Sequence, residues 1–167
     1  MKRTLSILLL LMAFSICCNA QINLGIKLLS QNKREIKILI TATNTNEKDS
    51  ILFYTPIEES ICMSLLNINF IESETAKIHE YFPCTWMTDI DQITLGKYNS
   101  VILKPGESYL LELKMKLKEI APFLKNTKYF IEANLSYEYG NFVSELKHEI
   151  FKGIVKSNRI EITNCKG

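Results

Sequence analysis

The stretch REIKILITATN, residues 34–44, decides the fold because apolar side chains recur in it at every second position. One face would carry four apolar side chains and the other a mixed set: Ile36, Ile38, Ile40 and Ala42 against Lys37, Leu39 and Thr41. Successive side chains of a β-strand point to opposite faces, whereas a helix repeats its apolar face about every 3.6 residues. The stretch therefore predicts a strand with one face in a core and one face in a wetter environment.

The same alternation recurs along the chain. The predicted strands lie at residues 22–30, 34–44, 50–54, 61–71, 100–103, 108–117, 129–139, 148–153 and 158–163. Turn-forming clusters such as NTNEKDS (44–50), KPGES (104–108) and YGN (139–141) separate them. One helix-like piece, LKEIAPFLKN (117–126), contains Pro122, which limits it to about one turn. About eight or nine short strands with one short helical turn predict an all-β, antiparallel sandwich.

The first residues, MKRTLSILLLLMAFSICCNAQ, have the pattern of an export signal. Lys2 and Arg3 precede an apolar run over residues 5–16, which is too short to span a bilayer. Small residues then surround a cleavage site after Ala20, so Gln21 is the expected mature start. We therefore predict a signal peptide at 1–20, one domain at 21–167, and a location in the periplasm or outside the cell.

Two other readings of this segment stay open. The apolar run could remain as an uncut anchor, or Cys17 or Cys18 could be acylated as in bacterial lipoproteins. Neither cysteine follows the Leu-small-small pattern of a lipoprotein signal. An acyl chain would hold the protein at the envelope membrane, and a membrane is an expected partner only in that case.

Export would leave the chain electrically balanced. Its 20 basic and 18 acidic residues become 18 of each, because the first 20 residues contain Lys2 and Arg3 and no acid. A nucleic-acid-binding protein needs a basic surface to offset phosphate charge. The balance therefore argues against nucleic acid as a partner and leaves protein as the expected one.

Residues that usually carry catalysis are sparse. His79 and His148 are the two histidines, and the sequence contains no HExxH, Gly-x-Ser-x-Gly or phosphate-binding glycine loop. Cys84 and His79 are conceivable as nucleophile and base, but a spacing of five residues is not specific for that chemistry. No CxxC or paired Cys/His spacing indicates a metal. The sequence therefore predicts a protein without catalytic activity, metal or cofactor.

Three cysteines follow the predicted signal, so at most one intramolecular disulfide can form: Cys62, Cys84 and Cys165. A Cys62–Cys84 bridge would close a loop of about 23 residues and stabilise the fold by roughly 3 kcal/mol. The alternative is a buried free thiol at Cys62, which would share a strand face with Leu66 and Ile68. Both readings stay open from the sequence.

The C-terminal half contains a series of architectural motifs. They are a Pro-Gly turn with a small polar residue, a tyrosine that opens a strand, and a closing Gly-x-Val-x-Ser-Asn-x-Ile-x-Ile: Pro105, Gly106, Ser108, Tyr129, Gly153, Val155, Ser157, Asn158, Ile160 and Ile162. Pro105 presets φ and Gly106 permits a positive φ, which suits a tight turn.

These motifs, over residues 99–163, resemble the end of secreted bacterial Ig-like domains, and residues 33–56 resemble an early strand pair of that fold more loosely. The resemblance implies an Ig-like β-sandwich in which Tyr129 would occupy a tyrosine corner, its hydroxyl bonded to upstream backbone. A weaker resemblance links the chain to sandwiches that inhibit proteinases.

The stretch HEYFPCTWMTD, residues 79–89, belongs to a region without such motifs, and loops that depart from a scaffold often carry function. We expect it to connect strands, with part in the core and part in a recognition surface. His79, Tyr81 and Trp86 are the candidate binding residues, since large rings with polar ends are enriched at binding hot spots. The alternative is that Phe82 and Trp86 plug the end of the sandwich.

Together these observations predict an exported, non-catalytic Ig-like module that binds a protein in the bacterial envelope. The alternative is a periplasmic proteinase inhibitor or a toxin-immunity type of protein.

Overall fold

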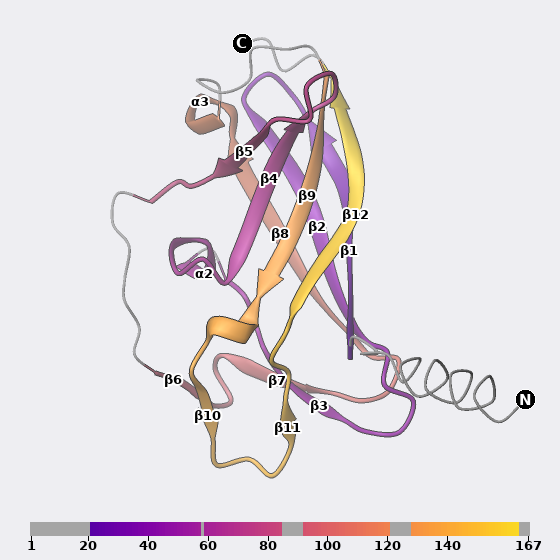
Figure 1. Cartoon of the computed structure of the whole chain (residues 1–167), viewed down its shortest axis with the longest axis vertical. Coiled ribbons are helices and arrows are strands. Elements are labelled where there is room, and N and C mark those ends of the chain that lie inside the picture. Colours follow the sequence, from indigo (N-terminus) through magenta and orange to yellow (C-terminus); the bar gives the residue numbers. More distant parts are fainter. Residues whose placement is uncertain (1–20, 58, 85–91, 121–127, 164–167) are drawn as a thin grey trace, which may run out of the picture.

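The computed structural model describes residues 21–57, 59–84, 92–120 and 128–163 (Figure 1). The predicted signal peptide and Trp86 lie outside these residues. The described strands are β1 (Ile22–Gln31), β2 (Glu35–Asn44), β3 (Ile51–Tyr54), β4 (Leu66–Glu72), β5 (Ile78–Tyr81), β6 (Ile93–Leu95), β7 (Ser100–Leu103), β8 (Ser108–Lys116), β9 (Lys128–Ser136), β10 (Phe142–Ser144), β11 (Glu149–Ile150) and β12 (Ile154–Thr163). The helices are α2 (Glu59–Cys62), α3 (Leu117–Ile120) and a 3-10 turn at Tyr137–Tyr139.

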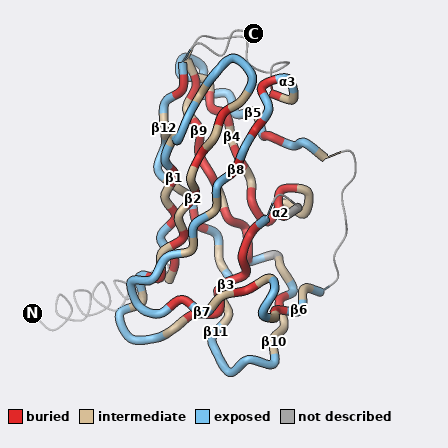
Figure 2. The backbone as a smooth tube through the Cα atoms, turned by 180° about the vertical axis from the view of Figure 1, so that it is seen from behind, coloured by how far each residue is buried: buried red, intermediate tan, exposed pale blue. Residues whose placement is uncertain are grey.

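Two antiparallel sheets pack face to face and form the body of the molecule. One sheet has the order β1-β2-β8 and the other the order β12-β9-β4-β5. The core between them contains Ile36, Ile38 and Ile40 of β2, together with Phe70 of β4 and Ile131 of β9. Buried positions lie along the facing strands, whereas the turns are exposed (Figure 2). Each such side chain contributes roughly 1.5–3 kcal/mol relative to an exposed position, so the alternation seen in the sequence is confirmed as the basis of an all-β sandwich.

Two smaller sheets, β11-β3-β7 and β10-β6, close one end of the sandwich (Figure 1). Five buried aromatic rings pack there, with centroids 5.3–6.2 Å apart: Phe53, Tyr54, Tyr137, Phe142 and Phe151. The Tyr137 hydroxyl donates to the Tyr54 carbonyl oxygen at 3.0 Å, and burial raises the pKa of this phenol well above its usual value. These rings make the end of the sandwich a second compact part of the core.

The structure corrects the predicted strand arrangement in two respects. It contains twelve strands in the described residues, because β5, β6 and β10 are three or four residues long and show no recognisable alternation. Two of the pairings, β6 with β10 and β3 with β11, are parallel. Residues 33–56 do not form a strand pair either, since β2 and β3 belong to different sheets.

Two predicted strand ends are also wrong. Cys62 lies in α2 and not on the face of β4, because the chain turns after Pro56 and the Ser60 hydroxyl accepts a hydrogen bond from the Ile57 N–H. The strand predicted at 129–139 ends at Ser136 and continues as a 3-10 turn. Tyr129 is fully buried at the start of β9. Tyr137 follows the other end of β9, in the aromatic part of the core, where its hydroxyl donates to upstream backbone as described above.

The turn between β7 and β8 has the geometry that its Pro-Gly pair predicts. Gly106 has φ +78°, and the Glu107 N–H donates to the Lys104 carbonyl at 2.9 Å. Pro105 precedes the glycine, as in a type II turn. The Gly106 N–H also donates to the carbonyl of the fully buried Asn44 at 2.9 Å, which attaches the turn to the end of β2.

The closing strand contains a bulge that joins the two sheets. Ser157 and Asn158 of β12 together oppose one residue of β9, Ala133, whose N–H donates to the Ser157 hydroxyl at 2.9 Å. Asn158 turns the other way, toward Ile26 of β1. Its Oδ1 accepts from the Ile26 N–H at 2.8 Å and its Nδ2 donates to the Ile26 carbonyl at 3.0 Å. The amide thus acts as a strand partner and links the edge of one sheet to the edge of the other.

Gly153 begins the same motif. A Cβ at this position would lie 3.2 Å from the Phe151 ring, and the Gly153 carbonyl accepts from the Tyr137 N–H at 2.9 Å. The glycine therefore allows the aromatic end of the core and β12 to approach closely.

We predict that Asn158→Ala lowers the free energy of unfolding by about 1–3 kcal/mol, because both polar groups of Ile26 lose their partner. Asn23→Ala is the control, since Asn23 is an exposed asparagine on β1, the strand that contains Ile26. The control should change stability by less than about 0.5 kcal/mol. Urea denaturation of the three proteins measures the difference, and equal stability of Asn158→Ala and the wild type would contradict the proposed role of the bulge.

Candidate functional site

The edges of the two sheets are joined on one side of the sandwich and separate on the other. Asn158 links β1 to β12. On the opposite side, β8 and β5 are the terminal strands of their sheets. Helices α2 and α3 lie near these two edges (Figure 1). This side of the molecule also contains the described part of the stretch that begins at His79.

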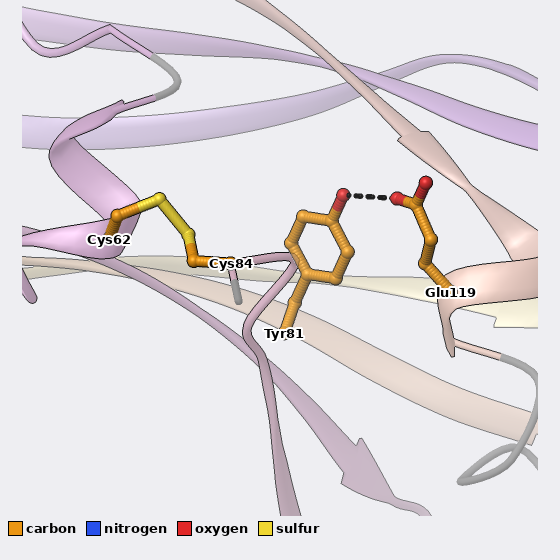
Figure 3. Close-up of a disulfide and its surroundings, with 4 residues drawn as sticks. All are labelled: Cys62, Tyr81, Cys84 and Glu119. Carbon is orange, nitrogen blue, oxygen red and sulfur yellow. Dashed lines mark hydrogen bonds between the residues drawn. A yellow bond between two sulfur atoms is a disulfide. The ribbon is translucent and has the colours of Figure 1, made fainter. Parts of the chain in front are cut away.

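A disulfide between Cys62 and Cys84 fixes the chain at this open side (Figure 3). It joins α2 to the segment after β5, with a Cα–Cα distance of 5.7 Å and a sequence separation of 22 residues. Pro83 lies between the end of β5 and the bridge, where it cannot disturb a ladder. A bonded sulfur is not a thiolate, so Cys84 cannot act as the nucleophile of a Cys84–His79 pair.

Tyr81 reaches from β5 across the opening. Its hydroxyl donates to Glu119 Oε2 of α3 at 3.0 Å, as Figure 3 shows. The ring is 6% exposed, which makes Tyr81 part of the core wall and not a free surface residue. The hydrogen bond connects the edge of one sheet to the helix that follows the edge strand of the other.

A cavity of about 220 Å³ lies beside this contact. Its walls combine apolar and polar side chains: Ile61, Pro83 and Leu113, with Tyr81, Glu119, Lys114 and Lys116. Pockets for drug-sized ligands usually have roughly 300–1,000 Å³. The cavity is smaller than that.

His79 makes a hydrogen bond with Glu72 near the turn between β4 and β5. Its Nε2 lies 2.8 Å from Glu72 Oε1, and both side chains are mostly buried. Hydrogen bonds from the Thr75 hydroxyl and then from His79 lower the pKa of the Glu72 carboxyl. The pair braces the turn between β4 and β5. His148 is exposed, before β11 and outside any strand.

The alternative role for Phe82, as a plug at the end of the sandwich, is not supported by its position. Phe82 is 40% exposed next to the disulfide segment. Together with the 60% exposed Ile78, it leaves apolar surface along β5. Trp86 lies outside the described residues, so its role stays a prediction.

Sequence reasoning missed the other wall of the cavity. Glu119 is 38 residues from Tyr81, and nothing in either local sequence indicates that they meet. A signal was present in LELKMKLK, residues 111–118, where lysines recur at alternate positions: Lys114 and Lys116 share one side of β8, and Lys118 follows in α3.

The described residues contain no group of three or more His, Cys, Asp or Glu side chains that could hold a metal ion. Within the same residues, no helix is long and apolar enough to cross a membrane.

No protein-family model and no curated protein matches the chain. Among solved structures, it is similar to a β-glucosidase from Kluyveromyces marxianus in complex with glucose, with 12% identity and a TM-score of 0.37 over 87% of this chain and 15% of that one. It is also similar to β-glucosidase 3B from Thermotoga neapolitana, with 12% identity and a TM-score of 0.35 over 86% and 17%. The chain thus spans less than a fifth of either enzyme, and these scores are too low to assign a shared fold or activity.

We predict that replacing both bridged cysteines, Cys62→Ala with Cys84→Ala, lowers the free energy of unfolding by about 3 kcal/mol, because the unfolded chain gains the freedom of the opened loop. Denaturation with and without dithiothreitol measures the effect. In reductant the wild type should fall to the level of the double variant. A wild-type midpoint that does not respond to reductant would show that the bridge does not contribute to stability.

Proposed function

We propose that this protein is an exported, non-catalytic Ig-like module that binds a protein partner in the bacterial envelope through its open side. The observation that carries the proposal is the cavity between Tyr81 and Leu113, which the disulfide and the Tyr81–Glu119 hydrogen bond hold in place. The motifs from Pro105 to Ile162 support the Ig-like assignment, since their Pro-Gly turn and Ser-Asn bulge are both architectural.

The shape and chemistry of the open side favour a protein over a small molecule. The cavity is lined by both apolar and polar side chains, and a pocket of this kind can receive the anchor residue of a protein interface. Ile78 and Phe82 add exposed apolar surface along the adjacent edge strand. An edge strand also offers unpaired backbone groups to an extended partner segment.

Export is part of the proposal, and the Cys62–Cys84 bridge supports it because such bonds persist in oxidising compartments. We expect the intact mass of the protein purified from its own cells to correspond to a chain that starts at Gln21. A mass that includes a diacylglyceryl group on Cys17 or Cys18 would instead indicate a lipid-anchored protein.

The binding proposal predicts that filling the cavity abolishes partner capture. Immobilised chain would be exposed to an envelope extract of its source cell, and the captured protein would be purified and titrated by calorimetry. Pro83→Trp should weaken binding by about tenfold or more, because the indole occupies the anchor pocket.

Trp86→Ala should weaken partner binding by about 2 kcal/mol with stability near the wild type if Trp86 belongs to the recognition surface. If Trp86 is a core plug, the same variant should lose about 3–5 kcal/mol of stability.

Ile154→Trp is the matched control for the cavity variant. It adds the same ring at an exposed position of β12, on the joined side of the sandwich and outside the cavity lining, and capture should be unchanged. Equal capture by Pro83→Trp and the wild type would refute the proposed binding site. A captured hydrolase or toxin whose activity falls when it binds would favour an inhibitor or immunity protein.

A further inference from the structure

A second hollow of about 370 Å³ lies next to the cavity, at the end of the β1-β2-β8 sheet. We call it the basic groove. Its lining side chains include five cations and one carboxylate: Lys33, Arg34, Lys114, Lys116 and Lys118, with Glu35. This concentration of positive charge stands out in a chain that has 18 basic and 18 acidic residues from Gln21 onward.

The carboxylates at the groove neutralise only part of its charge. Lys114 pairs with Glu35 at 2.6 Å, and this hydrogen bond lowers the pKa of the Glu35 carboxyl. Lys116 pairs with Glu119 at 3.6 Å. Within the described residues, the cations of Lys33, Arg34 and Lys118 have no carboxylate partner. Three exposed positive charges thus remain beside one hollow.

Backbone contacts hold these cations together in space. Asn32 Oδ1 accepts from the N–H groups of Arg34 and Glu35 at 2.7 and 3.0 Å, which fixes the turn between β1 and β2. The Leu117 N–H donates to the Arg34 carbonyl at 2.8 Å and joins this turn to the start of α3. A site whose backbone is already ordered loses less entropy when it binds a ligand.

The basic groove is continuous with the cavity of the proposed binding site. Lys114 and Lys116 line both hollows, so they form a ridge between the apolar pocket and the unpaired cations. A partner segment anchored in the cavity would place its neighbouring residues next to Lys33, Arg34 and Lys118. Carboxylates are the complementary groups for such a field.

We propose that the basic groove binds an acidic segment of the protein partner, with glutamate or aspartate side chains adjacent to the residue that enters the cavity. This inference rests on the proposed protein-binding function and adds the chemistry of the bound segment. The groove would set the specificity and the association rate, because exposed charge pairs act mainly on these quantities.

The test uses a fluorescein-labelled hexaglutamate peptide, which carries the charge without an apolar anchor. Fluorescence anisotropy of the purified chain should show saturable binding that weakens as NaCl rises from about 20 to about 150 mM, since salt screens exposed charges. Lys33→Glu with Arg34→Glu should raise the Kd about tenfold or more. Lys152→Glu with Lys156→Glu is the matched control, because it makes the same change in net charge at exposed positions on the β12 side, and should change the Kd by less than about twofold.

Three outcomes would overturn the inference: no saturable binding of hexaglutamate, equal loss in the two double variants, or binding of a heparin-derived sulfated octasaccharide about tenfold tighter than hexaglutamate. The last would identify a sulfated glycan as the ligand. Pro83→Trp separates this inference from the proposed function, since it should block partner capture and leave hexaglutamate binding intact. If the wild type does not bind hexaglutamate but its capture of the partner is still sensitive to Pro83→Trp, the proposed binding site stands and only the proposal of an acidic segment is refuted.

Discussion

The contact between Asn158 and Ile26 determines how this sandwich is closed. One side-chain amide satisfies both the N–H and the carbonyl of Ile26, so the edge of β1 is joined to the edge of β12 without a continuous ladder. The bulge that turns Asn158 toward β1 would leave Ala133 without a backbone partner, and the Ser157 hydroxyl accepts that N–H instead. The two side chains of the Ser-Asn pair have different roles: Ser157 replaces a hydrogen bond that the bulge removes, and Asn158 joins the edges of the two sheets.

The two sheets are joined along only one side of the sandwich, so their edges on the opposite side are held by other contacts. The two sheets are tied at β1 and β12, and their opposite edges, β8 and β5, are held by contacts of a different kind. The Tyr81–Glu119 hydrogen bond spans the opening at 3.0 Å, and the Cys62–Cys84 bridge fixes the chain beside it. A cavity remains beside these two contacts, because side chains do not completely fill the space between the edges of the two sheets. The open side therefore has a defined shape, which a surface that recognises a partner needs.

The sequence predicted the strands in which apolar residues alternate, and it missed the elements that depend on contacts between residues far apart in the chain. Alternation of apolar residues located every run that contains a long strand, as in β2, where Ile36, Ile38 and Ile40 are all buried. It failed at Cys62, because two-residue alternation carries no information about the helical turn that Ser60 stabilises. It also missed β6 and β10, whose parallel pairing is between segments 49 residues apart at Ile93 and Phe142. Of the candidate binding residues, Tyr81 lines the cavity and His79 does not, whereas Glu119, 38 residues from Tyr81, became visible only through a tertiary contact.

Net charge and local charge are different constraints on a partner. The balanced composition of the chain from Gln21 onward argues against a long-range field of the kind that nucleic acid binding requires. It does not exclude a local one, because the screening length in physiological salt is only about 8 Å. Lys33, Arg34 and Lys118 line one hollow of the surface, where their fields add. A partner would therefore sense the groove once it has approached the open side, where the basic groove would orient the bound segment and speed its association.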